Sequence, residues 1–77
     1  MHTSALRHGV SAEDALLAAT EYVVKAELAE DRELRLGFDS AGRLLETVVV
    51  ILSSGQQAVI HAMPARRTFL ALLERKT

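Results

Sequence analysis

Residues 33–52 read ELRLGFDSAGRLLETVVVIL, and the predicted architecture is built around them. The first six of these residues alternate polar and apolar side chains, which is the period of a β-strand with one solvated face. The cluster DSAG at residues 39–42 is typical of a turn. Residues 44–52 are apolar on both faces except at Glu46 and Thr47, so they predict the central strand of a sheet.

A turn, a strand and a helix are expected on the C-terminal side of this stretch. Residues 53–56 form a second turn cluster, and residues 57–63 predict the last strand. Pro64 cannot donate to a strand ladder, but it suits the first turn of a helix. Residues 65–76 then predict a C-terminal helix, because apolar side chains recur at helical spacing at Phe69, Leu70, Leu72 and Leu73.

On the N-terminal side, Ser11 followed by Asp14 resembles a capping box and predicts the start of a short helix that ends near Tyr22. Two alternatives are open for the next segment. Residues 22–27 predict a weak additional strand, whereas residues 26–30 fit an extension of the helix equally well. The predicted fold class is therefore α+β, a three- or four-stranded antiparallel β-meander with a short N-terminal helix and a C-terminal helix.

Length and composition point to one domain over residues 1–77, with residues 1–10 as a polar lead. The chain is 49% hydrophobic and 25% charged, which is typical of a globular protein, and its lack of cysteine suits a cytoplasmic location. No apolar run approaches the roughly 18 residues that a membrane span needs. Because so small a core has no covalent staple, a partner chain or a homodimer is expected.

The net charge of −1 gives no overall positive excess for binding nucleic acid, so an RNA-binding site is expected to rest on a local basic patch. Arg66 and Arg67 open the C-terminal helix against its macrodipole, so they either serve a partner or extend over the sheet edge. Arg7 and His8 form a smaller basic spot. No metal site is predicted, because the acidic residues between positions 27 and 33 are typical of a solvated loop.

The register of the first hairpin gives one half of a candidate site. A four-residue loop at 39–42 would place Phe38 opposite Arg43. The same register would place Arg35 directly opposite Glu46, with both side chains on one face of the sheet.

The second hairpin gives the other half. A loop of two or four residues would place Val48 opposite His61, with Glu46 as a diagonal neighbour of His61. The stripe formed by Val48, Val50 and Val59 on the open face predicts a partner surface. The face expected beneath the helices carries Leu34, Leu36, Leu45, Thr47, Val49, Ile51, Ala58, Ile60 and Ala62, and the open face carries Glu33, Arg35, Glu46, Gln57 and His61 beside that stripe.

Arg35, Glu46 and His61 are therefore expected to share the open face. A histidine that titrates near neutral pH, a carboxylate that orients it and an arginine that holds an anion are groups that phosphodiester cleavage uses. The alternative is an ion pair between Arg35 and Glu46 beside a surface histidine, worth about 0.2–1 kcal/mol.

The order of short motifs along the chain points to a family. These motifs are Arg7-His8-Gly9-Val10-Ser11, Glu13-Asp14, Glu30-Asp31-Arg32, Leu36-Gly37, Gly42-Arg43-Leu44-Leu45, Val48-Val49-Val50, Ile60-His61-Ala62 and Arg66-Arg67. Over roughly residues 7–73 their order resembles the BrnT-type toxins of bacterial toxin–antitoxin systems, which belong to the RelE-like superfamily of small ribonucleases.

The resemblance implies a RelE-like α+β fold, RNA cleavage without metal or cofactor, and neutralisation by a small antitoxin protein. It implies that His8 stands at the family's basic-His-Gly position and that Arg66 and Arg67 correspond to its terminal basic cluster. Together with Arg7, these residues are the expected RNA contacts. The expected function is therefore the toxin of a type II toxin–antitoxin pair that acts as a ribonuclease.

In this interpretation His61 is the general base or acid, and Glu46 orients it. Arg35, Arg66 and Arg67 hold the scissile phosphate and the charge that develops on it.

Two other functions stay open. The chain could be a non-catalytic protein-binding module on the same fold, acting through Val48, Val50 and Val59. Met63-Pro64 favours this alternative, because the family tends to have basic residues just after the last strand. The chain could also be a homodimer that pairs its sheets and has no chemical role.

Overall fold

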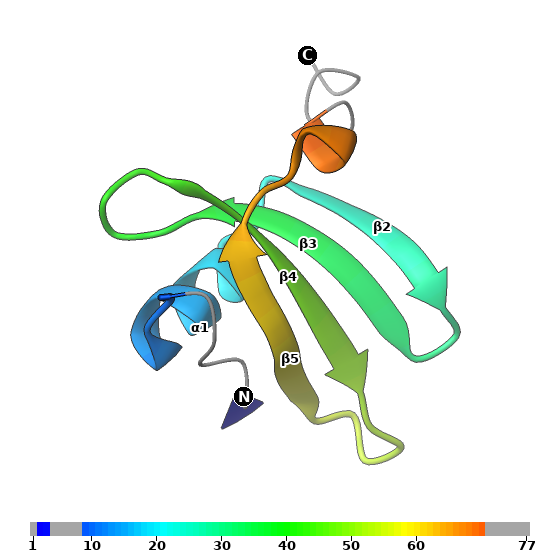
Figure 1. Cartoon of the computed structure of the whole chain (residues 1–77). Helices are drawn as coiled ribbons and strands as arrows, with labels where there is room; N and C mark the ends of the chain where they lie inside the picture. Colours follow the sequence, from blue (N-terminus) through cyan, green and yellow to red (C-terminus); the bar gives the residue numbers. More distant parts are fainter. Residues whose placement is uncertain (1, 4–8, 71–77) are drawn as a thin grey trace.

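The computed structural model describes residues 2–3 and 9–70, and its main feature is a five-stranded sheet in the order β1-β5-β4-β3-β2 (Figure 1). Strands β2 to β5 form an antiparallel meander, and the two-residue β1 pairs parallel with β5. The chain is thus α+β, as predicted, with β4 in the middle of the sheet. The elements are β1 (His2–Thr3), α1 (Ala12–Thr20), β2 (Val24–Ala29), β3 (Arg32–Phe38), β4 (Leu44–Ile51) and β5 (Gln57–Pro64).

The segment with two open alternatives forms a strand. β2 pairs with β3 from Val24 opposite Leu36 to Ala29 opposite Arg32, so the helix does not extend across residues 26–30. β1 was not predicted, because two residues are too few for a periodic pattern. The C-terminal helix is seen at residues 67–70, so it begins two residues later than predicted, and the rest of its predicted span, at 71–76, lies outside the described residues.

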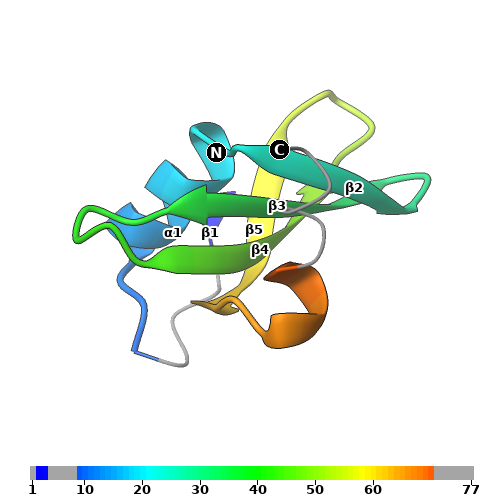
Figure 2. The same ribbon diagram turned by 90° about the horizontal axis from the view of Figure 1, so that it is seen from above.

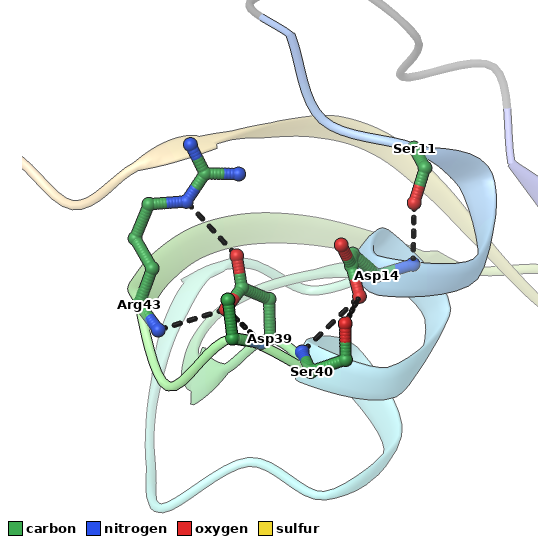
Figure 3. Close-up of polar contacts among 6 residues, drawn as sticks. Ser11, Asp14, Asp39, Ser40 and Arg43 are labelled. Atoms are coloured by element: carbon green, nitrogen blue, oxygen red, sulfur yellow. Dashed lines mark hydrogen bonds and ion pairs between the residues drawn. The ribbon is translucent and has the colours of Figure 1, made fainter.

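α1 covers one face of the sheet, and the C-terminal turn, formed by the helical residues 67–70 and Arg66 directly before them, lies on the other side of β3 and β4 (Figure 2). The cap of α1 forms as predicted, because the Ser11 side chain accepts a hydrogen bond from the Asp14 backbone N–H at 3.1 Å. The Asp14 carboxylate, however, accepts from the backbone N–H and the hydroxyl of Ser40, at 3.1 and 2.8 Å (Figure 3). Asp14 therefore fastens the helix to the β3–β4 loop instead of closing a reciprocal capping box.

α1 approaches the sheet closely because its buried face is small. Ala15, Ala18 and Ala19 are all 0% exposed, and they pack over β3 where Gly37 has no side chain. A Cβ atom at Gly37 would overlap the backbone of Ala18, lying 2.9 Å from its carbonyl carbon. The core on this side of the sheet consists of Val10, Ala15, Ala18, Ala19, Leu45, Val49, Val59 and Ala62.

The β3–β4 loop is one residue longer than predicted, at residues 39–43. The Asp39 carboxylate holds it by accepting from the backbone N–H groups of Ala41 and Arg43, at 3.0 and 2.8 Å, and from Arg43 Nε at 2.9 Å (Figure 3). Phe38 consequently pairs with Leu44, and the predicted pairing with Arg43 was wrong.

This loop shifts every pair between β3 and β4 by one position. Arg35 stands opposite Thr47, and Glu46 stands opposite Leu36. Since neighbouring side chains on a strand alternate between faces, Arg35 lies on the α1 side and Glu46 on the other side. The prediction that Arg35 and Glu46 share a face was therefore wrong. So was the placement of Leu34 and Leu36 beneath the helices, because both lie on the side of Glu46.

A β-bulge in β5 changes the faces of the last strand. The predicted pair Val48–His61 is present, but the next pair is Val49–Val59, so Ile60 is an additional residue. Val59 therefore turns into the core, where it is 0% exposed, and Ile60 is 40% exposed. Four expectations were wrong for this reason: Val59 as part of an open stripe, Gln57 on the open face, and Ala58 and Ile60 beneath the helices.

Neither α1 nor the helical turn at 67–70, the helices within the described residues, is long and apolar enough to span a lipid bilayer.

The contact between α1 and Gly37 predicts a large effect of Gly37→Ala. The added methyl group has backbone atoms in its way, so α1 must shift, and the free energy of unfolding should fall by about 2–3 kcal/mol. Gly55→Ala is the matched control, because Gly55 has φ +89 but open space around it, and it should cost only about 1–2 kcal/mol through backbone strain. Urea unfolding measures both values, and equal stability of Gly37→Ala and wild type would contradict this packing.

Candidate functional site

A groove of about 490 Å³ lies on the face of the sheet away from α1. Its floor comes from β3, β4 and β5, and its walls come from the β2–β3 hairpin on one side and the C-terminal turn on the other. The lining residues are Leu28, Ala29, Arg32, Leu34, Glu46, Val48, Ile60, His61, Arg66 and Phe69.

The carboxylate of Glu46 is the most constrained group in this groove, with its side chain only 1% exposed. Arg66 donates three hydrogen bonds to it, from the backbone N–H at 3.0 Å, from Nε at 2.9 Å and from Nη2 at 3.0 Å. His61 Nε2 lies 3.2 Å from Oε2, the carboxylate oxygen that also accepts from Arg66 Nη2. A bidentate arginine with a backbone donor is among the strongest arrangements for a buried carboxylate.

These contacts keep Glu46 ionised. Burial by itself raises the pKa of the Glu46 carboxyl group, but the hydrogen bonds from Arg66 and His61 and the charge of Arg66 outweigh it and lower the pKa below its usual value. An ionised carboxylate can only accept hydrogen bonds, so the Nε2 nitrogen of His61 is the donor.

Local structure explains how Arg66 reaches Glu46. Pro64 ends the pairing of β5 with β4 opposite Leu45, since it has no N–H to donate. The backbone N–H of Ala65 then donates to Leu44 O at 3.0 Å, which holds the chain beside β4 for one more residue. Arg66 follows directly and lies over Glu46, with its guanidinium carbon 5.2 Å from the ring centroid of Phe69.

Arg35 is occupied on the opposite face. It donates to Ala19 O at the end of α1 at 2.9 Å and to Gln57 Oε1 at 3.3 Å, and it pairs with Glu33 at 3.0 Å. Its guanidinium carbon also lies 4.9 Å from the Tyr22 ring centroid. The expected Arg35–Glu46 ion pair is therefore absent, and Arg66 takes that position on Glu46.

Of the other predicted site residues, His61 does meet Glu46, whereas Arg67 is exposed on the helical turn beside Arg66. Arg7 and His8 lie outside the described residues. In the predicted partner stripe, Val48 and Val50 are half-buried and Val48 lines the groove, but Val59 is in the core.

Six groove residues were not expected at the site from the sequence, namely Leu28, Ala29, Arg32, Leu34, Ile60 and Phe69. Leu28 and Ile60 sit at β-bulges, which no periodic pattern reveals. The apolar spacing of the C-terminal helix singled out Phe69 without indicating which face it covers.

The arrangement limits the chemistry that the groove can perform. Glu46 already accepts bonds from four donors, so it can orient His61 but is poorly placed to take a proton from a substrate. The His61 side chain is 30% exposed, so its ring can meet a ligand. Among residues 2–3 and 9–70, no three histidine, aspartate or glutamate side chains converge as metal ligands.

Comparison of the chain with models of known families, with curated proteins and with solved structures finds no match.

The lowered pKa of Glu46 predicts a specific pH dependence of stability. At neutral pH, Glu46→Gln should lower the free energy of unfolding by about 2 kcal/mol, because charge-assisted hydrogen bonds are lost and an amide NH₂ meets Arg66. The folded protein binds fewer protons than the unfolded chain, so the contribution of Glu46 is complete above about pH 5 and disappears as the pH falls through the folded pKa. Urea unfolding between pH 7 and about pH 3 should therefore show the two proteins converging.

Asp39 provides the internal control. Burial by itself raises the pKa of the Asp39 carboxyl group. Hydrogen bonds from Arg43 and Ala41 lower this pKa by more than burial raises it, so the net pKa lies below its usual value. Both proteins retain Asp39, so its contribution cancels in their difference. A difference that stays constant down to pH 3 would show that Glu46 is not held as described.

Proposed function

We propose that the chain is a toxin of a type II toxin–antitoxin pair with a RelE-like fold and that it cleaves RNA at the groove. The observation that carries the proposal is the contact between His61 Nε2 and Glu46 Oε2, at 3.2 Å, at the edge of a groove with arginines on both sides. The resemblance of the segment order to BrnT-type toxins supports the same conclusion.

The proton chemistry centres on His61. With Nε2–H directed at Glu46, Nδ1 is the ring nitrogen of acceptor type. That nitrogen can accept the proton of a ribose 2′-hydroxyl as its oxygen attacks the neighbouring phosphate. The bond from phosphorus to the 5′-oxygen then breaks, leaving a 2′,3′-cyclic phosphate, and the departing 5′-oxygen takes a proton back from the imidazolium. Glu46 stabilises the imidazolium that results, in the way that a buried carboxylate supports a catalytic histidine in hydrolases.

The phosphate is held by the arginines around the groove. Two side-chain nitrogens of Arg66 contact Glu46, and its other guanidinium N–H groups are directed elsewhere and can meet a phosphate oxygen. Arg67 is exposed next to it, and Arg32 lines the groove from the hairpin side. This cluster supplies the local positive charge that a chain with a net charge of −1 needs for RNA.

A cleavage assay on single-stranded RNA with EDTA present tests the proposal. His61→Ala should reduce the rate by about 10²–10⁴-fold, because a general acid or base typically contributes that much. Arg67→Ala should weaken RNA binding and make it less sensitive to salt, and Arg43→Ala is the matched control, because Arg43 lies on the β3–β4 loop at Asp39 and not in the groove. Equal cleavage by wild type and His61→Ala would remove the ribonuclease assignment.

A second candidate function is a non-catalytic module that binds a protein. The observation in its favour is that six of the ten groove residues are apolar and that the acceptors of Glu46 are already used. In that case no variant cleaves RNA, and an apolar segment of a partner occupies the groove. Val48→Asp would then abolish binding of the partner, whereas His61→Ala would leave it unchanged.

A further inference from the structure

β2 forms one edge of the sheet, and among the described residues nothing lies beyond it (Figure 1). The strand is long enough to pair with another chain, and it exposes apolar side chains. Leu28 is 53% exposed, and Val23, immediately before the strand, is 47% exposed. An edge of this kind presents a row of unpaired backbone groups that can accept a further strand.

The ladder of β3 shows which backbone groups of β2 point outward. Asp39 N donates to Arg43 O and Ile51 N donates to Asp31 O, so odd-numbered residues of β3 bond to β4. Even-numbered residues then face β2, in agreement with the hydrogen bond from Val23 N to Leu36 O. Val24 and Ala26 of β2 pair with these even-numbered residues and form the backbone hydrogen bonds between the two strands. The backbone N–H and C=O groups of Lys25 and Glu27 therefore point away from the sheet.

The side chains of these two outward residues carry opposite charges on the same face. Within the chain each stands directly opposite a residue of its own sign, Lys25 opposite Arg35 and Glu27 opposite Glu33. The attractive contact on this side is the diagonal one from Lys25 Nζ to Glu33, at 3.7 Å. Pairing with β3 alone would favour the reverse order of the two charges.

We propose that a second copy of the chain pairs antiparallel with β2, about a two-fold axis at Ala26. In this register Lys25 forms a hydrogen-bonded pair with Glu27 of the second copy, and the same pair repeats on the other side of the axis. Val24 then faces Leu28 of the second copy on the groove side of the sheet.

The charges select this register. A shift by two residues would bring Lys25 against Lys25, or Glu27 against Glu27, and like charges directly opposite are destabilising. Strands that avoid self-pairing commonly carry charges of one sign, because identical edges then repel each other. β2 carries one of each sign, and about Ala26 they are complementary.

The pairing has a consequence for the grooves. The two-fold axis is perpendicular to the sheet, so the grooves of both copies open on the same side of one continuous sheet. Leu28 lines each groove next to the junction. Pairing at β2 does not depend on the chemistry at His61, so it is expected whether or not the groove is catalytic.

Exchanging the charges of Lys25 and Glu27 in the intact chain tests the pairing. The measurement is sedimentation velocity at protein concentrations from micromolar to millimolar. Wild type should be a dimer at the upper end. Glu27→Lys should weaken dimerisation by at least ~10-fold, since it places Lys25 against lysine twice. Within the chain the new lysine faces Glu33, so the variant is expected to fold. The double variant Lys25→Glu with Glu27→Lys should restore the dimer, because the exchanged charges are again complementary.

Backbone hydrogen exchange provides a second measurement on wild type. The N–H groups of Lys25 and Glu27 should become protected as the concentration rises, while those of Val24 and Ala26 are protected throughout. A wild type that stays monomeric at millimolar concentration would overturn the proposal. So would a dimer that Glu27→Lys leaves intact, or a double variant that stays as weak as Glu27→Lys.

Discussion

The groove face depends on one constraint, which is that the buried charge of Glu46 must be met by donors. A carboxylate with a 1% exposed side chain is costly unless its hydrogen bonds are satisfied. Arg66 supplies three of them and His61 supplies the fourth. Because these residues lie on the central strand, the neighbouring strand and the C-terminal turn, satisfying Glu46 holds three parts of the chain together. The same contacts place the imidazole at the edge of the groove.

Each face of the sheet uses one arginine in this way. On the groove side, Arg66 joins the C-terminal turn to β4 through Glu46. On the other side, Arg35 joins the end of α1 to the sheet by donating to Ala19 O, and Glu33 balances its charge. Charged residues in the middle of a small sheet are tolerated because each has a fixed partner on its own face. The polar side chains that a ligand in the groove can reach are therefore His61 and the arginines around it.

Local patterns predicted which segments become strands and helices, but they did not predict the register, that is, which residues of neighbouring strands stand opposite each other. The alternation around Leu34 and the apolar run after Leu44 are properties of the sequence alone, and both strands form where expected. The register between β3 and β4 depends on how Asp39 closes its loop, and the register between β4 and β5 depends on the additional residue Ile60. Each of these features shifts the pairing by one residue. The predicted pair Val48–His61 is present, because the bulge at Ile60 comes directly before His61 in β5 and shifts only the pairs on its other side. The unfavourable position of Arg66 at a helix start was the one sequence signal of its role.

The most direct test of this account is the register of β3 against β4, measured by nuclear Overhauser effects in solution. In the register described, the α-protons of Leu36 and Glu46, which form a non-hydrogen-bonded pair, should give a strong contact, and the Nε proton of Arg66 should give a contact to the Glu46 side chain. Contacts that pair Arg35 with Glu46 instead would place the carboxylate against a different arginine and contradict it.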